Sequence, residues 1–261
     1  MTDMEGVAGI LNADDYADQG SRYYEVAREL TTLEVSAAVQ GCLDERAAEV
    51  VVVDGHGAGA IDPRLLHPRA VLLAGRPVGY PFGCDATFGA AMMVGQHAKA
   101  NTDGGHLCHT GSFEVEELTI NGVSVGEMGC NMLFCAYFGV PVVLVSGDEA
   151  AAAEARALVP GIETVAVKAG VRRGPATGRT GQENKLYNGA AVHLHPNVAR
   201  ERIRHGAATA VARRRGILPF QLDPPYELVE VLRPTADTPA RTARVQAQDL
   251  VELLSAPRQY T

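Results

Sequence analysis

Carboxylate and imidazole side chains that could bind metal ions recur in short, separated motifs in the first half of the chain. The six residues are Asp3, Glu5, His56, His97, His109 and Glu127. Asp, Glu and His are the ligands that hard and borderline divalent ions prefer in proteins. Their number exceeds what one tetrahedral zinc ion needs, so the sequence suggests two ions that share a bridging carboxylate.

Some of these residues also have an ordinary structural interpretation. An Asp-x-Glu pair close to a chain end is usually only solvated, and Glu127 could be an N-terminal helix residue favoured by the helix dipole. The apolar sequence after Glu127 indicates instead that its carboxylate is buried, where an unpaired charge is costly. His193 and His195 could form another metal pair, but they have no carboxylate partner nearby in the sequence, so we do not expect a metal there.

Two of the histidines follow short apolar runs that are typical of buried parallel strands. Residues 49–53 come before His56, and residues 90–94 come before His97. In doubly wound sheets, functional sites gather at the carboxyl ends of the strands. We therefore expect His56 and His97 to converge on one crevice.

The sequence around these runs alternates between helical and strand patterns. The expected elements are helices at 23–44 (with Gly41 breaking the run near its end), 127–138 and 148–158 (capped by Asp148), strands at 70–74, 141–145 and 164–168, and a hairpin within 113–125 that turns at Asn121-Gly122. Strands that alternate with helices imply a parallel sheet covered on both faces. We predict an α/β fold with three αβα layers around a mainly parallel sheet.

The amino-acid composition changes after Lys168, where a stretch rich in Gly, Arg, Thr and Asn begins. Beyond it, the patterns predict a helix at 197–214, strands at 226–231 and 243–247, and a short helix at 248–255. We therefore predict two domains. Residues 1–168 would form the metal-binding α/β domain, and residues 169–261 a smaller α+β domain.

Charge and composition exclude some classes of partner. The formal net charge of −8 disfavours nucleic acid and anionic membrane surfaces. No apolar run reaches the length of a membrane span, and no cationic and apolar leader precedes residue 20. The five cysteines include no Cys-x-x-Cys pair, which is typical of reduced, mostly buried thiols. We therefore expect a cytoplasmic protein without a nucleic-acid or membrane partner.

Five segments taken together resemble the zinc-dependent D-aminopeptidase family. They are Asp3-Met4-Glu5-Gly6, Asp54-Gly55-His56, Gly95-Gln96-His97-Ala98, Cys108-His109-Thr110 and Gly126-Glu127-Met128-Gly129-Cys130-Asn131. Each motif is weak by itself, whereas five in the family's order are specific. The resemblance covers about residues 3–170 well and the remainder more loosely.

The resemblance implies a site and an activity. Two zinc ions would be held by Asp3 (the preferred bridge), Glu5, His56, His97 and Glu127, and His109 would be the catalytic residue. We expect general acid or base catalysis by His109, because two zinc ions already activate water. Family members assemble as ring-shaped homodecamers, two stacked pentameric rings, and remove N-terminal residues from short peptides. The founding member prefers D-Ala peptides such as D-Ala-D-Ala.

Three features depart from the family pattern. Only two residues precede Asp3, where the family has a strand, so we expect the segment with Asp3 and Glu5 to fray. Cys108 stands before His109 in place of a small hydroxyl residue, and a thiol there could bind metal or oxidise. His106 adds a second imidazole close to His109, so the catalytic role could fall to either histidine.

Three functions stay open at the level of sequence. The first is the dinuclear zinc aminopeptidase. The second is a metallohydrolase of another small amide or ester on the same scaffold, because fold and metal do not fix the substrate. The third is a metal-depleted ring that binds peptides without catalysis. Metal content and a substrate panel would separate them.

Overall fold

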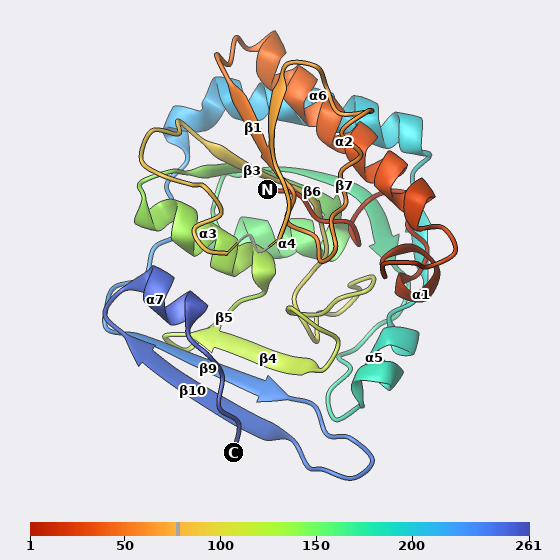
Figure 1. Ribbon diagram of the computed structural model, residues 1–261, viewed down its shortest axis with the longest axis vertical. Coiled ribbons are helices and arrows are strands. Elements are labelled where there is room, and N and C mark those ends of the chain that lie inside the picture. Colours follow the sequence, from red (N-terminus) through yellow and green to blue (C-terminus); the bar gives the residue numbers. More distant parts are fainter. Residues whose placement is uncertain (77–78) are drawn as a thin grey trace.

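The computed structural model describes residues 1–76 and 79–261, and Figure 1 shows its elements. The helices are α1 (Ala13–Tyr16), α2 (Tyr24–Asp44), α3 (Glu127–Tyr137), α4 (Glu149–Leu158), α5 (Gly181–Tyr187), α6 (Pro196–Arg213), the 3-10 helix η1 (Arg214–Gly216) and α7 (Leu250–Ser255). The strands are β1 (Val50–Val53), β2 (Ala70–Leu73), β3 (Ala91–Gln96), β4 (Val115–Ile120), β5 (Val123–Ser124), β6 (Val142–Asp148), β7 (Glu163–Gly170), β8 (Ala191–His193), β9 (Tyr226–Leu232) and β10 (Arg241–Ala247).

A mainly parallel layer of strands forms the centre of the protein. β3, β6 and β7 pair in parallel, and β8 adds an antiparallel edge beside β7. β1 and β2 form a parallel pair of their own. Thr2 bridges Asp54 on one side and Val94 on the other, so the first residues of the chain connect this pair to the larger sheet. The predicted parallel sheet is confirmed.

The first residues of the chain are held inside this layer, so the expectation that they fray is wrong. The Thr2 amide donates to Val53 O at 3.0 Å, and the Asp3 amide donates to Val94 O at 2.9 Å. Both residues are buried. Residues 1–3 thus fill the position of a short strand between β1 and β3, with a neighbour on each side.

Helices cover both faces of the layer, as the predicted three-layer arrangement requires. α2 and α6 lie together on one face, and α3 and α4 cover the other (Figure 1). The residues of β6 divide between two cores: Val143 and Leu144 pack with the α2 and α6 side, whereas Val142 and Val145 pack with the α3 and α4 side. A strand that is apolar on both faces is expected for a sheet with helices on both sides.

Gly41 does not break α2, which continues through it to Asp44. The residue serves close packing instead. A Cβ atom at Gly41 would lie 2.2 Å from the backbone oxygen of Arg204 on α6. Glycine is required there because the two helices touch along their backbones.

A second, antiparallel sheet lies below α3 in Figure 1, with the strand order β10-β9-β4-β5. The predicted hairpin is confirmed: β4 and β5 pair antiparallel and turn at Asn121-Gly122, where both residues have positive φ. β4 precedes residue 168 and β9 follows it, so this sheet takes strands from both sides of the predicted boundary. The division into domains at residue 168 stays a prediction.

Helix α5 and strand β8 were not predicted. α5 begins with a capping box in which Thr180 accepts from the amide of Glu183 and the Glu183 carboxylate accepts from the amide of Thr180. The Thr-x-x-Glu spacing was therefore a readable helix signal. Within the described ranges, no helix is long and apolar enough to cross a membrane.

Candidate metal centre

The candidate ligands meet at the carboxyl ends of β1 and β3, where the N-terminal segment passes between these strands. His56 follows β1 and His97 follows β3, and both side chains lie against Asp3. The expected convergence of the two histidines on one site is therefore observed. Gly6 allows this close approach, because a Cβ atom there would lie 2.1 Å from the backbone oxygen of Gln96.

Asp3 lies between two groups of potential ligands. Its Oδ1 is 3.2 Å from Nδ1 of His56, and its Oδ2 is 3.3 Å from Nε2 of His97. Each oxygen of one carboxylate thus faces a different histidine. This is the arrangement that a carboxylate shared by two cations would need.

The first group consists of Asp3, Glu5 and His56, whose ligand atoms lie within 4.8 Å of one another. Nε2 of His56 bonds to Ala17 O at 3.0 Å, which turns Nδ1 toward the two carboxylates. Such a second partner fixes both the tautomer and the ring orientation of a metal-binding histidine. The ring of His56 is therefore already oriented for Nδ1 to act as a ligand.

Glu5 carries an unsatisfied oxygen inside this group. Its Oε2 is 3.1 Å from Nδ1 of His56, yet it is buried without a hydrogen-bond partner. An orphaned carboxylate oxygen in the interior is costly. A cation between Glu5, Asp3 and His56 would satisfy it, so these residues fit a metal ion.

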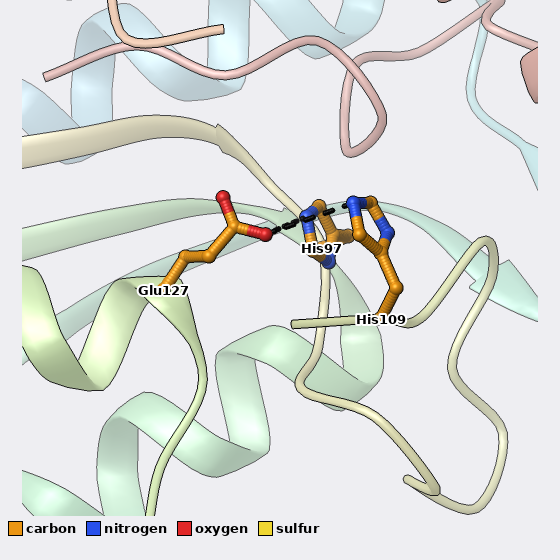
Figure 2. Close-up of side chains that lie close together, drawn as sticks. All are labelled: His97, His109 and Glu127. Atoms are coloured by element: carbon orange, nitrogen blue, oxygen red, sulfur yellow. Dashed lines mark ion pairs between the residues drawn. The ribbon is translucent and has the colours of Figure 1, made fainter. Parts of the chain in front are cut away.

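The second group consists of His97, His109 and Glu127, shown in Figure 2. Oε1 of Glu127, the first residue of α3, is 3.5 Å from Nε2 of His97 and 3.6 Å from Nε2 of His109. The two imidazoles are stacked, with centroids 3.9 Å apart. All three side chains point toward one another (Figure 2), so the group offers two nitrogens and a carboxylate to one position.

Backbone carbonyls fix the orientation of both rings in the second group. Nδ1 of His97 bonds to Ala98 O at 2.9 Å, and Nδ1 of His109 bonds to Leu107 O at 2.8 Å. A ring nitrogen facing a carbonyl must carry the proton. In the neutral form of either ring, Nε2 is then unprotonated, and it is turned toward Glu127.

The site is buried except at one edge. The side chain of Glu127 is 36% exposed, whereas that of His97 is 3% exposed. Glu127, which the sequence indicated to be buried, is therefore only partly buried, and the residues of α3 that follow it are buried. Solvent reaches the site from the Glu127 side.

Packed charges shift the pKa values in the first group. Burial, together with the neighbouring Glu5, raises the pKa of Asp3 to about 6. Burial alone would also raise the pKa of Glu5, but His56 holds it well below its usual range. Burial would lower the pKa of His56, yet Glu5 and Asp3 raise it to about 12. Two buried carboxylates held close together repel each other, and this repulsion favours the binding of a cation between them.

Burial lowers the pKa of His109, and the neighbouring imidazole of His97 lowers it further. The ring is thus neutral at pH 7. Phe113 stacks against the same ring, with centroids 4.4 Å apart. Sequence reasoning missed Phe113, and no local signal marks it, because its role depends on where the loop after His109 folds back.

Other residues considered from the sequence lie elsewhere. Cys108 is fully buried, and burial with nearby Asp148 raises the pKa of its thiol to about 12, so it is neither a metal ligand nor readily oxidised. His106 points to Leu11 O at 3.2 Å, away from the two groups. His109, and not His106, therefore lies beside His97.

The remaining polar candidates have structural roles. The Asp54 carboxylate accepts from the amides of Ala60 and Ile61. Asp148 caps α4, as predicted. Nδ1 of His193 accepts from the amide of Gly9, and His195 caps α6, so these two histidines do not form a metal pair.

Comparison with known proteins places this geometry in a family. Residues 1–257 match the profile of the Peptidase M55 family, whose description is D-aminopeptidase. The chain belongs to the M55 peptidase family. The resemblance inferred from the five motifs is therefore confirmed, and it extends over nearly the whole chain.

Two related proteins carry the comparison further. A D-aminopeptidase of Bacillus subtilis (strain 168) is 37% identical over 174 residues, which span 66% of this chain and 63% of that relative. A solved structure, the Zn-dependent D-aminopeptidase DppA from Bacillus subtilis, described as a self-compartmentalizing protease, matches with a TM-score of 0.83 at 28% identity. That match covers 97% of this chain and 92% of the other. The two proteins therefore share their fold over nearly the whole of this chain.

Proposed function

We propose that this M55 family member is a dinuclear zinc aminopeptidase that removes the N-terminal residue of short peptides, with D-amino-acid peptides such as D-Ala-D-Ala as substrates. The observation that carries the proposal is the position of Asp3. Its two oxygens face His56 and His97, which belong to different groups of ligands. Each group of ligands supports one metal position, and the carboxylate shared between the groups supports a centre with two metal ions.

The residues divide into ligands and a proton carrier. Asp3 would bridge the ions, with Glu5 and His56 completing one position and His97 and Glu127 the other. Bound zinc would supply an activated water and would polarise the scissile carbonyl. The remaining steps are assigned to the side chains of this chain.

His109 is proposed as the general acid and base. Its Nδ1 proton is engaged by Leu107 O, and its Nε2 is free to accept a proton at the site and to return it to the leaving amine. Its lowered pKa favours the neutral form that can accept that proton. His109 stacks on His97 and faces Glu127, so it stands beside both the ligands and the solvent-exposed edge.

We also propose that the protein acts as a homodecamer of two stacked pentameric rings in the cytoplasm. The related solved structure is described as self-compartmentalizing. Several large apolar side chains are exposed on the single chain, among them Leu218 at 80% and Val192 at 67%, and such side chains favour a partner surface. The five unpaired cysteines suit a reducing compartment. Sedimentation would test the assembly, because a decamer should have about ten times the 27.6 kDa mass of one chain.

Zinc content and turnover test the proposed activity together. We expect two zinc ions per chain by elemental analysis, and release of D-Ala from D-Ala-D-Ala. Asp3→Asn should lower the zinc content toward one or zero and abolish turnover, because the bridging charge is lost. Asp237→Asn, which changes an exposed carboxylate on a distant loop, should keep both properties.

A substrate panel identifies the class of bond that is cut. The panel would contain D-Ala-D-Ala, L-Ala-L-Ala, an N-acetylated dipeptide and small esters. Cleavage that requires a free amine supports an aminopeptidase. Two bound zinc ions with turnover only of other amides or esters would show a different metallohydrolase, and absence of both zinc and turnover would show a binding protein.

A further inference from the structure

The segment that carries Glu5 is held in place by ionisable side chains outside the proposed ligand set, and most of these side chains are buried. Residues 5–11 contain no helix or strand of their own, so contacts from elsewhere must fix their path. Four side chains supply such contacts, each from a different part of the chain: Glu34 of α2, His106, Lys168 of β7 and His193 of β8.

Lys168 binds the segment at two points. Its ammonium, in a side chain that is only 4% exposed, donates to the backbone oxygen of Glu5 and to that of Ile10, the latter at 3.2 Å. A buried charge is tolerated only where it is paired and hydrogen-bonded. Here the bonds connect both ends of residues 5–10, so the ammonium fixes the shape of the turn between them.

Glu34 and His193 hold the middle of the segment. Oε1 of Glu34 accepts from the amide of Ala8 at 3.0 Å, and Nδ1 of His193 accepts from the amide of Gly9 at 3.2 Å. Glu34 is 1% exposed, on a helix that has an exposed face available to a charged residue. The buried Glu34 carboxylate therefore has a specific role, which is to accept the hydrogen bond from the Ala8 amide.

We propose that Lys168 and Glu34 are positioning residues of the metal centre, which hold the backbone of residues 5–10 so that the Glu5 carboxylate faces Asp3 and His56. The inference rests on the proposed function, because it takes Glu5 as a metal ligand. Ligand geometry must be held to about half an ångström to be effective. The backbone oxygen that Lys168 binds belongs to Glu5 itself, so a shift at that bond displaces the ligand directly.

Lys168→Met is the first variant to make, because methionine keeps most of the length of the side chain and removes the charge and the donors. Zinc affinity would be measured by competition with a chromophoric chelator, and the site would be viewed through the visible absorption of the cobalt-substituted protein. We expect one of the two ions to bind about 10- to 100-fold more weakly, with a changed cobalt spectrum.

Leu228→Ala is the matched control for lost stability. Leu228 of β9 is fully buried, and it belongs to a core cluster that contains none of residues 5–11. The control should lower the melting temperature and leave both zinc affinities and the cobalt spectrum unchanged. If Lys168→Met behaves in the same way, Lys168 is only structural and its positioning role is overturned. If the wild-type chain does not bind two zinc ions, the proposed function fails and this inference falls with it.

A second pair of variants gives an answer even if Lys168→Met does not fold. Glu34→Gln keeps an oxygen that can accept from the amide of Ala8, whereas Glu34→Met removes it. We expect the Gln variant to bind zinc within about 2-fold of the wild type and the Met variant to lose about 10-fold or more in one affinity. Equal affinities in these two variants would overturn the positioning role of Glu34.

Discussion

The two ring nitrogens of His109 have different environments. Nδ1 bonds to the carbonyl of Leu107, two residues earlier, and this local contact fixes the tautomer. Nε2 faces the partly exposed Glu127 at 3.6 Å. The side chain is therefore held at one nitrogen and available at the other, which suits a proton carrier as well as a ligand.

Replacing His109 separates these two roles. If His109 transfers protons, His109→Ala should lower kcat by about 10²- to 10⁴-fold and leave two zinc ions bound, because the proposed ligands are intact. Elemental analysis and steady-state kinetics on one preparation check both statements. Loss of one zinc ion from His109→Ala would instead identify the residue as a ligand.

The six proposed site residues were readable from the sequence because each lies in a short motif that resembles one of the family's, and His56 and His97 also follow apolar runs. The sequence could only favour Asp3 over Glu5 as the bridging ligand. The contacts that distinguish Asp3, with His56 and His97, join residues more than 50 positions apart. Glu34 and Lys168 were not predicted as functional residues. A single carboxylate in a helical pattern is usually solvated, and only the packing of residues 5–11 against α2 buries Glu34.

At the scale of elements, the N-terminal segment depends on close backbone contact with the end of β3. The Gly6 amide donates to Gly95 O at 2.8 Å, and no side chain fits between them. Gly6→Ala should therefore displace the segment, cost about 1–3 kcal/mol of stability, and reduce zinc binding and turnover. Gly57→Ala is the control, because an added Cβ there meets nothing within 4 Å. Denaturant unfolding and zinc titration of both variants would check this, and equal behaviour of the two would contradict it.

The burial of Glu34 within α2 also predicts a pH dependence. Burial raises the pKa of Glu34 from 4.5 to about 7, although the Ala8 amide and the charges of Lys168 and Arg200 act against this. Between those pH values the folded protein keeps a proton that the unfolded chain releases. Stability contributed by Glu34 is therefore highest below pH 4.5 and falls as pH rises toward 7, by an amount on the order of 3 kcal/mol.

Urea unfolding in the presence of a chelator would measure this dependence, with wild type and Glu34→Gln compared at pH 5 and pH 7.5. The variant should lose less stability than the wild type over this interval. The difference between the two proteins isolates Glu34 from the other buried groups that titrate. Identical slopes would show that Glu34 does not hold a proton in the folded state.

The strands and most helices were predictable because their apolar periodicity is local. The pairing of β4 with β9 was not, because more than 100 residues separate these strands and no sequence pattern specifies which strands meet. The same holds for β8, a strand of three residues that exists only as an edge beside β7. Gly41 was misread for a related reason, since its contact with α6 is non-local.

At the scale of the whole molecule, zinc should act as a stabilising ligand. The unfolded chain has no preformed site, so binding free energy adds to folding free energy. Zinc at about 100-fold above its dissociation constant should add about 2.7 kcal/mol per site. Chelator should lower the melting temperature by several degrees, and added zinc should restore it. Scanning calorimetry with and without chelator measures this, and an unchanged melting temperature would argue against metal in the folded state.

The place of Thr2 between Val53 and Val94 has a consequence for how the protein is made. Residues 1–3 are synthesised before their neighbours on both sides, which follow about 50 and 90 residues later. The proposed ligand set closes only when Glu127 follows. A nascent chain shorter than this cannot assemble the complete proposed centre, so we expect hydrolytic capacity to arise only after Glu127 has been synthesised.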